Sequence, residues 1–157
     1  MKLTKLFLVL ASATSFVVGA GAPAFAVSPA TNNLTVSANV ANQCVVAAAS
    51  LDFGDYKFDA NTDGSATLTL TCTPDTTTTV KLGLGGNASG SQRNMLKGTD
   101  LLSYGLYTDA GRGTAWPVAG VAGPVGSGTV TVYGRIPSGQ NKPTGIYQDT
   151  VVVSVDF

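Results

Sequence analysis

The residues of this chain that could do chemistry are few, and the first set to consider is a run of short oxygen ligands. Asp59-Ala60-Asn61-Thr62-Asp63-Gly64 matches the opening of a calcium loop, in which alternating carboxylate and amide oxygens surround the ion. The twelfth position of such a loop supplies a carboxylate, but counting from Asp59 it is Leu70. Asp, Asn and Gly also build ordinary turns. We therefore predict a connecting turn here and no metal site.

The candidate catalytic residues do not form a recognisable set. The chain has no His, so a Ser or Cys nucleophile would lack its usual base. Its nine acidic residues are all Asp and could in principle supply a glycosidase pair, but most fall in predicted turns or on outward faces. Trp116 and Tyr107 could stack on sugar rings, although one Trp before a Pro more often packs in a core. The sequence favours a protein that is not an enzyme and needs no cofactor.

Residues 1–26 have the features of a secretory signal peptide. Lys2 and Lys5 precede an apolar run from Leu6 to Val18, and Ala24-Phe25-Ala26 fits a cleavage site. The run is too short for a retained membrane span, which needs about 20 apolar residues. We therefore expect residues 1–26 to be removed and the remainder to be exported without inserting into a membrane.

The exported part has roughly 131 residues, which is the size of one domain. Without Lys2 and Lys5 it carries seven basic residues against nine Asp, so it offers no field that would attract nucleic acid. Its two cysteines, Cys44 and Cys72, are predicted to form a disulfide in an oxidising compartment. Two buried free thiols are the alternative.

Period-two alternation of apolar and polar residues predicts half-buried strands over most of residues 44–157. Turn-rich segments separate the strands at 59–65, 85–92, 109–114, 120–128 and 137–145. This spacing predicts a β-sandwich of two antiparallel sheets. The predicted inward sets are Cys44, Val46 and Ala48; Leu68, Leu70 and Cys72; Val80, Leu82 and Leu84; Leu102, Tyr104 and Leu106; Val130, Val132, Gly134 and Ile136; and Val151, Val153, Val155 and Phe157.

A further alternating segment precedes the first cysteine and forms an N-terminal arm, residues 27–43. Its apolar positions are Leu34, Val36, Ala38 and Val40. Only residues 41–43 separate Val40 from Cys44, and they span about 10 Å when extended. The arm is therefore too short to cross to a distant edge of its own domain, although a hairpin against the first strand remains possible.

Several motifs, taken together, indicate a family. They are Phe53-Gly54-x-Tyr56, Tyr133-Gly134-Arg135-Ile136 and Tyr147-x-Asp149 ahead of the last alternating strand, with "LTLTC", "RNML" and "LLSYGLYTD" between them. In this combination the chain resembles the spore coat protein U family, and within it the secreted pilin subunits of archaic, Csu-type chaperone-usher pili. The resemblance covers essentially the whole exported part.

The resemblance implies an incomplete immunoglobulin-like sandwich, which lacks its last strand and leaves an apolar groove open. In such pili a periplasmic chaperone lends a strand to the groove, and at the outer-membrane usher the arm of the next subunit replaces it. The expected donor-strand residues are Leu34, Val36, Ala38 and Val40. The expected chaperone contacts, at the groove edge on the last strand, are Val151, Val153, Val155 and Phe157.

The function implied by the resemblance is that of a structural pilus subunit, exported through the periplasm to the cell surface and used for adhesion and biofilm formation. We expect a stalk subunit, because roughly 131 residues leave no room for a separate receptor-binding domain. Its partners would be the chaperone, the usher and other copies of itself or sister pilins. The alternatives are a secreted coat or matrix protein that self-associates without an usher, and a sugar-binding module that uses Trp116.

Overall fold

The computed structural model describes residues 28–48 and 50–157, so the predicted signal peptide lies outside the described part. The chain divides into a unit that ends at Ser37 and a unit formed by Ala38–Phe157. In the first unit, residues 28–37 form no helix or strand and their side chains are exposed. The second unit contains the sandwich. Within the described part, no helix is long and apolar enough to cross a membrane.

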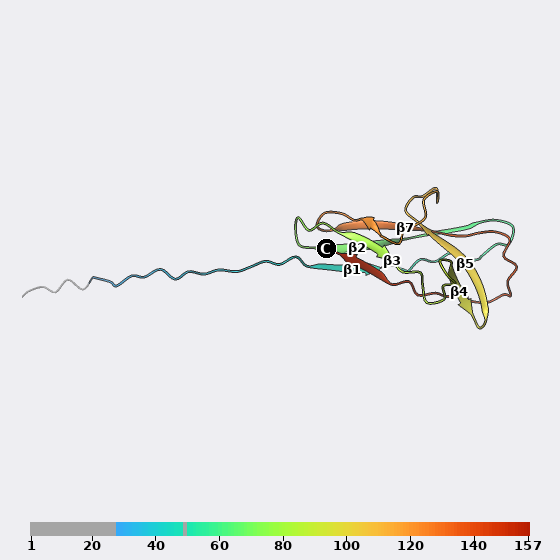
Figure 1. The fold of residues 1–157 in the computed structure, drawn as a ribbon, viewed down its shortest axis with the longest axis horizontal. Helices are drawn as coiled ribbons and strands as arrows, with labels where there is room; N and C mark the ends of the chain where they lie inside the picture. The colour runs from blue at the N-terminus through green and yellow to red at the C-terminus, as the bar shows by residue number, and fades with distance from the viewer. Residues whose placement is uncertain (1–27, 49) are drawn as a thin grey trace, which may run out of the picture. The chain divides into compact units, whose positions relative to one another are not determined.

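Eight strands in the described residues form two antiparallel sheets (Figure 1). The larger sheet has the order β1-β2-β7-β5-β4 and the smaller one the order β6-β3-β8, so β1 and β8 are each the last strand of a sheet. The predicted all-β sandwich is confirmed. The strands are β1 Cys44–Ala48, β2 Thr62–Cys72, β3 Thr79–Leu82, β4 Arg93–Lys97, β5 Asp100–Tyr107, β6 Val121–Ala122, β7 Gly128–Ile136 and β8 Val153–Asp156.

The core forms where the inward faces of the two sheets meet. Burial alternates along β2, β5 and β7, with threonines on much of the outward face of β2, as the period-two pattern predicts. Threonine and valine are also residues that favour a pleated, half-buried backbone. The buried apolar cluster consists of Leu68, Leu70, Val80, Leu82, Leu102, Tyr104, Leu106, Trp116, Val132 and Ile136.

The predicted disulfide between Cys44 and Cys72 is confirmed. The two cysteines lie opposite each other in the β1–β2 ladder. The Thr73 N–H donates to the Gln43 carbonyl at 2.9 Å, and the Gln43 N–H donates to Thr73 Oγ1 at 3.1 Å. The point at which the arm joins the sandwich is therefore held covalently and by two hydrogen bonds.

Two strand boundaries differ from the prediction. β2 begins at Thr62, inside the segment 59–65 that was predicted as a turn, because Asp63 faces Arg135 of β7 and accepts two hydrogen bonds from it, at 2.7 and 2.8 Å. The last strand is shorter than its pattern, since β8 covers only Val153–Asp156. The short strands β4 and β6 were not predicted, because neither has a clear alternation of its own.

The ladder between β5 and β7 is short and leaves parts of both strands unpaired. Only Gly105–Tyr107 of β5 pair with β7, opposite Tyr133–Arg135. Where β7 ends, the side-chain amide of Gln140 covers the edge of β5: it accepts from the Ser103 N–H and donates to the Ser103 carbonyl, both at 2.8 Å. The first half of β7 pairs with β2 and has no strand on its other side among the described residues.

Candidate functional site

The candidate site is a cleft of about 730 Å³ that lies beside the end of β1 and the start of β8. One wall consists of the end of β1 and residues 50–53, and the other of residues 146–151 with the start of β8. Among the described residues β1 pairs only with β2 and β8 only with β3, so each of the two strands that border the cleft has one edge that no strand covers. We call this cleft the groove.

The floor of the groove is the apolar core. Leu68, Leu82, Leu106 and Val132 reach it from β2, β3, β5 and β7 and are themselves nearly fully buried. Apolar surface that lies between two unpaired strand edges has the shape and chemistry to receive one more strand, since backbone groups would pair with the edges and alternate side chains would contact the floor.

Residues 50–53 form their wall because two glycines in the sheet beneath them leave space for their side chains. Gly64 of β2 and Gly134 of β7 pair with each other and face inward. A Cβ at Gly134 would lie 2.7 Å from Cζ of Phe53, and one at Gly64 would lie 3.1 Å from Cδ2 of Leu51. The two glycines therefore make room for Leu51 and Phe53, which pack down over the sheet.

Residues 146–153 form the other wall, and backbone hydrogen bonds join them to β4 and to the residues that follow β3. Gln148 exchanges two backbone hydrogen bonds with Leu96 of β4, at 2.8 and 3.1 Å. The Val152 carbonyl accepts from the Gly83 N–H at 2.9 Å, and the Thr150 carbonyl accepts from the Gly86 N–H at 3.1 Å. This wall is therefore in place before any ligand arrives.

Asp149 is the polar anchor of that wall. Its Oδ2 accepts a hydrogen bond from the Tyr104 hydroxyl at 2.6 Å, and its Oδ1 accepts from the N–H groups of Gly86 at 2.9 Å and Asn87 at 3.3 Å. Gly85 lies against it with a φ of 92°, and a Cβ there would come within 1.9 Å of the carboxylate. The glycine is therefore required for the close approach of Asp149.

The groups around Asp149 are partly buried, and their ionisation reflects this. Burial raises the pKa of Tyr104 well above its ordinary value, and the hydrogen bond to Asp149 raises it further, so Tyr104 remains a neutral donor. Burial lowers the pKa of the nearby Arg93 guanidinium. Arg93 donates from Nε to the Gly83 carbonyl at 3.0 Å and from Nη2 to the Leu82 carbonyl at 3.3 Å. These contacts support the floor and do not form a catalytic arrangement.

The structure places the predicted groove-edge residues at different depths. Val151 and Val153 line the groove. Val155 is half-buried and lies opposite Val80 of β3, whereas Phe157 follows the end of β8 and is 56% exposed. The four residues are therefore not equivalent, and the first two are those that a bound strand would meet.

The predicted donor residues are exposed. Leu34 is 88% exposed, Val36 84% and Val40 83%, and Ala38 is exposed as well. Residues 28–43 contain no strand. Exposed aliphatic side chains in alternation form an apolar stripe without a partner in the described structure, which is the chemistry that a donor segment requires.

Two other candidates from the sequence have structural partners. In the possible calcium loop, Asp63 is bonded to Arg135, and Asn61 Oδ1 accepts from the Ser138 N–H at 2.9 Å. No metal-binding group of His, Cys, Asp or Glu occurs among the residues the structure describes. The idea that Trp116 is a stacking platform for sugars is wrong, because its side chain is packed in the core and 4% exposed.

Sequence reasoning missed three supporting residues. Arg93, Asn94 and Gln140 use their side chains to satisfy strand and loop backbone groups. Their only signal was a polar residue within or beside an alternating pattern, which does not show whether the side chain faces solvent or a buried carbonyl.

A sandwich with an open apolar groove between its terminal strands defines a class of proteins that can accept a strand from another chain. The chain belongs to the Spore Coat Protein U domain family, whose domain matches residues 30–154. It is 36% identical over 155 residues to Protein U of Myxococcus xanthus, and the match covers 82% of this chain and 85% of that protein.

A solved structure also matches. It is the crystal structure of the CsuC-CsuE chaperone-tip adhesion subunit pre-assembly complex from the archaic chaperone-usher Csu pili of Acinetobacter baumannii, with a TM-score of 0.54 and 26% identity. The match covers 75% of this chain and 40% of the matched chain. The predicted family and the pilin-like β-sandwich fold are therefore confirmed.

Proposed function

We propose that this chain is a structural subunit of a chaperone-usher pilus that polymerises by donor-strand exchange. The observation that carries the proposal is the groove, in which an apolar floor lies between residues 50–53, which follow β1, and residues 146–151, which precede β8. Such a groove is a liability in a free monomer, because exposed edges and apolar surface favour aggregation. A strand supplied by another molecule removes that liability.

The donor in the polymer is the arm of another copy or of a sister pilin, with Leu34, Val36, Ala38 and Val40 facing the floor. Burying each larger aliphatic side chain contributes about 1.5 to 3 kcal/mol, before the hydrogen bonds of the new ladder and the cost of association are included. Because these side chains are exposed in the described structure, the free energy of burying them remains available for binding another molecule. The arm acts between molecules because Gln43 is already bonded to Thr73 and residues 41–42 add only about 7 Å of reach.

Before assembly, a periplasmic chaperone occupies the groove, and an outer-membrane usher is the place of exchange. The matched crystal structure is a chaperone complex of a pilus subunit, which supports the first partner. We place the chaperone contact on the groove edge formed by Val151 and Val153 and its continuation along β8 to Val155 and Phe157. In this proposal the chain is exported through the periplasm to the cell surface, where it forms part of the pilus.

The chain has both a groove and a donor arm, so one copy can accept a strand and donate one. A subunit with both can occupy an internal position in a linear polymer, and we therefore assign it to the stalk. Its contribution to adhesion and biofilm formation would be structural and not enzymatic, since the polar groups at the groove are engaged in holding its walls.

A coat or matrix protein that self-associates without an usher is the second candidate. The family description and the 36% identity to Protein U favour it. Both candidates use the same groove and arm, and they differ in the machinery around them. Chaperone and usher genes beside the gene for this chain would support the pilus, and their absence together with an assembled surface layer would support the coat.

The proposed function is tested by deleting residues 27–41 in the full chain and examining protein sheared from the cell surface. The wild type should run as a ladder on a gel when unboiled and as a monomer when boiled, because strand exchange is non-covalent. The deletion should abolish the ladder. Thr35→Asp, which changes the opposite face of the arm, is the matched control and should retain it. A normal ladder from the deletion would contradict the proposal.

A further inference from the structure

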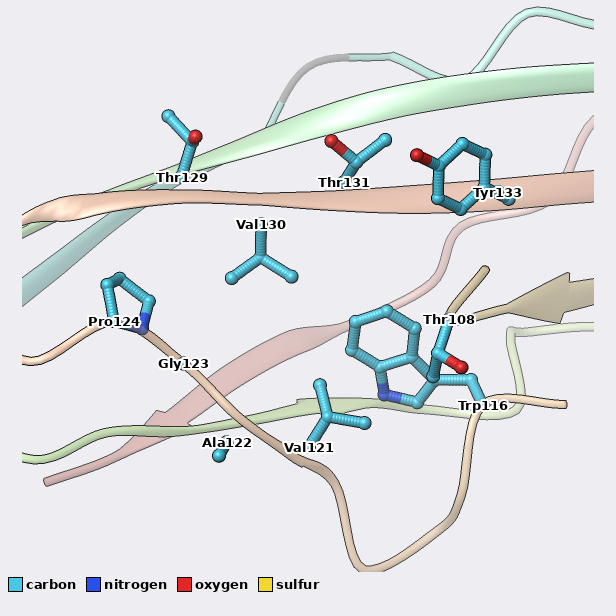
Figure 2. Close-up of a pocket in the computed structure, with 10 residues that line it drawn as sticks. All are labelled: Thr108, Trp116, Val121, Ala122, Gly123, Pro124, Thr129, Val130, Thr131 and Tyr133. Atoms are coloured by element: carbon cyan, nitrogen blue, oxygen red, sulfur yellow. The ribbon is translucent and has the colours of Figure 1, made fainter. Parts of the chain in front are cut away.

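A second cleft, of about 530 Å³, lies between β6 and the first half of β7 (Figure 2). It shares no lining residue with the groove. Figure 2 shows β7 along one side with Thr129, Thr131 and Tyr133 following one another, and residues 121–124 along the other. Val130 and Val121 extend from these two sides toward the space between them.

The cleft is short, because the unpaired edge of β7 is closed at both ends. Pro124 packs against Gly128, where a Cβ would lie 2.7 Å from Cβ of the proline. At the other end, β5 pairs with β7 from Tyr133 onward. The free edge is therefore limited to Gly128–Val132, about 13 Å of strand. An extended chain cannot run through it, which distinguishes this cleft from the groove.

Trp116 places a hydrogen-bond donor beside the cleft. Its side chain is 4% exposed, and its Nε1 is the one buried side-chain nitrogen or oxygen in the described residues that has no hydrogen-bond partner. In Figure 2 the nitrogen lies on the edge of the ring that points toward Val121. Buried polar groups are nearly always paired, so this donor is available to an acceptor that enters the cleft from outside.

We propose that this cleft binds a short, uncharged carbohydrate of one or two rings. No charged side chain lines the cleft, which argues against an ionic ligand. Its volume lies within the range of roughly 300 to 1,000 Å³ for small-molecule sites. Sugar hydroxyls can pair with the free backbone edge of β7 and with Thr108, while C–H faces contact Val121 and Val130, which extend into the cleft (Figure 2). The indole N–H of Trp116 donates to a sugar oxygen, so the residue acts through its edge and not its face.

The test uses the full exported chain, in which Trp116 is the only Trp and so reports on the cleft directly. Uncharged mono- and disaccharides are titrated while the indole N–H signal is followed by NMR and binding is measured by calorimetry. A binding sugar should shift the indole signal downfield in a saturable manner. Trp116→Phe, which keeps a ring but removes the donor, should weaken binding about tenfold, the effect of one lost hydrogen bond. Phe58→Leu changes an exposed aromatic outside both clefts and should bind normally.

The proposal is overturned if no sugar shifts the indole signal at concentrations up to about 10 mM, or if Trp116→Phe binds with unchanged affinity. It is also overturned if uncharged tetrapeptides shift the signal and no sugar does, because the cleft would then be a peptide site. If Trp116→Phe does not fold, the indole shift of the wild type decides alone. Neither outcome changes whether the chain forms a polymer at the cell surface. The carbohydrate inference and the proposed pilus function can therefore be contradicted independently of each other.

Discussion

Two segments of this chain carry the same pattern and have different environments. The arm has Leu34, Val36, Ala38 and Val40 at alternate positions, and the C-terminal segment has Val151, Val153, Val155 and Phe157. The described part of the arm contains no strand, and Leu34, Val36 and Val40 are each more than four-fifths exposed. Val153 and Val155 are half-buried in β8, which pairs with β3. Alternation thus indicates that a segment can become a strand, but the available edge decides whether it does.

The largest expected effect concerns the covalent boundary between the arm and the sandwich. Replacing both Cys44 and Cys72 by Ser should lower the free energy of unfolding by about 3 to 4 kcal/mol, because the unfolded chain regains the entropy of the closed loop. Denaturant titration of the purified chain measures this. The wild type in reductant should match the double variant. Equal stability with and without the bond would show that hydrogen bonds, such as those of Gln43 with Thr73, hold the boundary alone.

Placing a charge in each segment tests the comparison directly. Val153→Asp should destabilise the sandwich by about 2 kcal/mol, because a carboxylate would enter the apolar groove without a partner. Val36→Asp should change the stability of the monomer by less than about 0.5 kcal/mol, because the side chain is exposed, yet it should abolish the heat-sensitive ladder. Thermal unfolding and gel migration of both variants give the result. A destabilised monomer with Val36→Asp would mean that the arm folds onto its own domain.

Residues 146–151, the groove wall that leads into β8, depend on the hydrogen bonds of Asp149, and the described part of the arm has no equivalent contact. Asp149→Ala should cost about 1 to 3 kcal/mol, because the Tyr104 hydroxyl and the N–H groups of Gly86 and Asn87 lose their acceptor. Asp156→Ala is the matched control: its carboxylate is exposed and forms an ion pair with Lys81 at the surface, so a change within about 0.5 kcal/mol is expected. Urea unfolding measures both. Similar values for the two variants would remove the role of Asp149.

The smallest effect concerns the outer, polar face of β2. The hydrogen bond from Arg135 holds the pKa of Asp63 below its ordinary value of 3.8. Ionised Asp63 therefore stabilises the fold above about pH 4, and this contribution is lost as the pH falls through the lowered pKa. Asp63 is about one-third exposed, so solvent screening limits the contribution to less than about 1 kcal/mol. The stability difference between wild type and Asp63→Asn should shrink between pH 5 and about pH 2; a constant difference would contradict this assignment.

Much of the fold follows from short-range patterns in the sequence. The inward faces of β2, β5 and β7 were predicted from alternation alone, because burial of every second residue is a local property of a strand. The pairing of Cys44 with Cys72 was predictable because the chain has two cysteines. The start of β2 was not, since its first residues look like a turn until Arg135, 72 positions away, provides a partner for Asp63.

The candidate sites show the same division. The resemblance gave the arm and the last strand as partners of a groove, but the walls of that groove depend on Asp149 under Tyr104 and on two inward glycines under Leu51 and Phe53. Trp116 was interpreted as core packing or as a sugar platform. The structure places it in the core with its donor unpaired at a second cleft, which no pattern in the sequence could indicate.

The sequence by itself determined which residues can face a core, which cysteines can join, and that one apolar stripe lies ahead of the first strand. Those properties depend on residue type and on spacings of a few positions. Only the tertiary structure decided which strand edges find partners and which remain free, because an edge is satisfied by residues far away along the chain. The unpaired edges of β1 and β8, and the short free edge of β7, are consequences of that packing, and both proposed binding sites lie there.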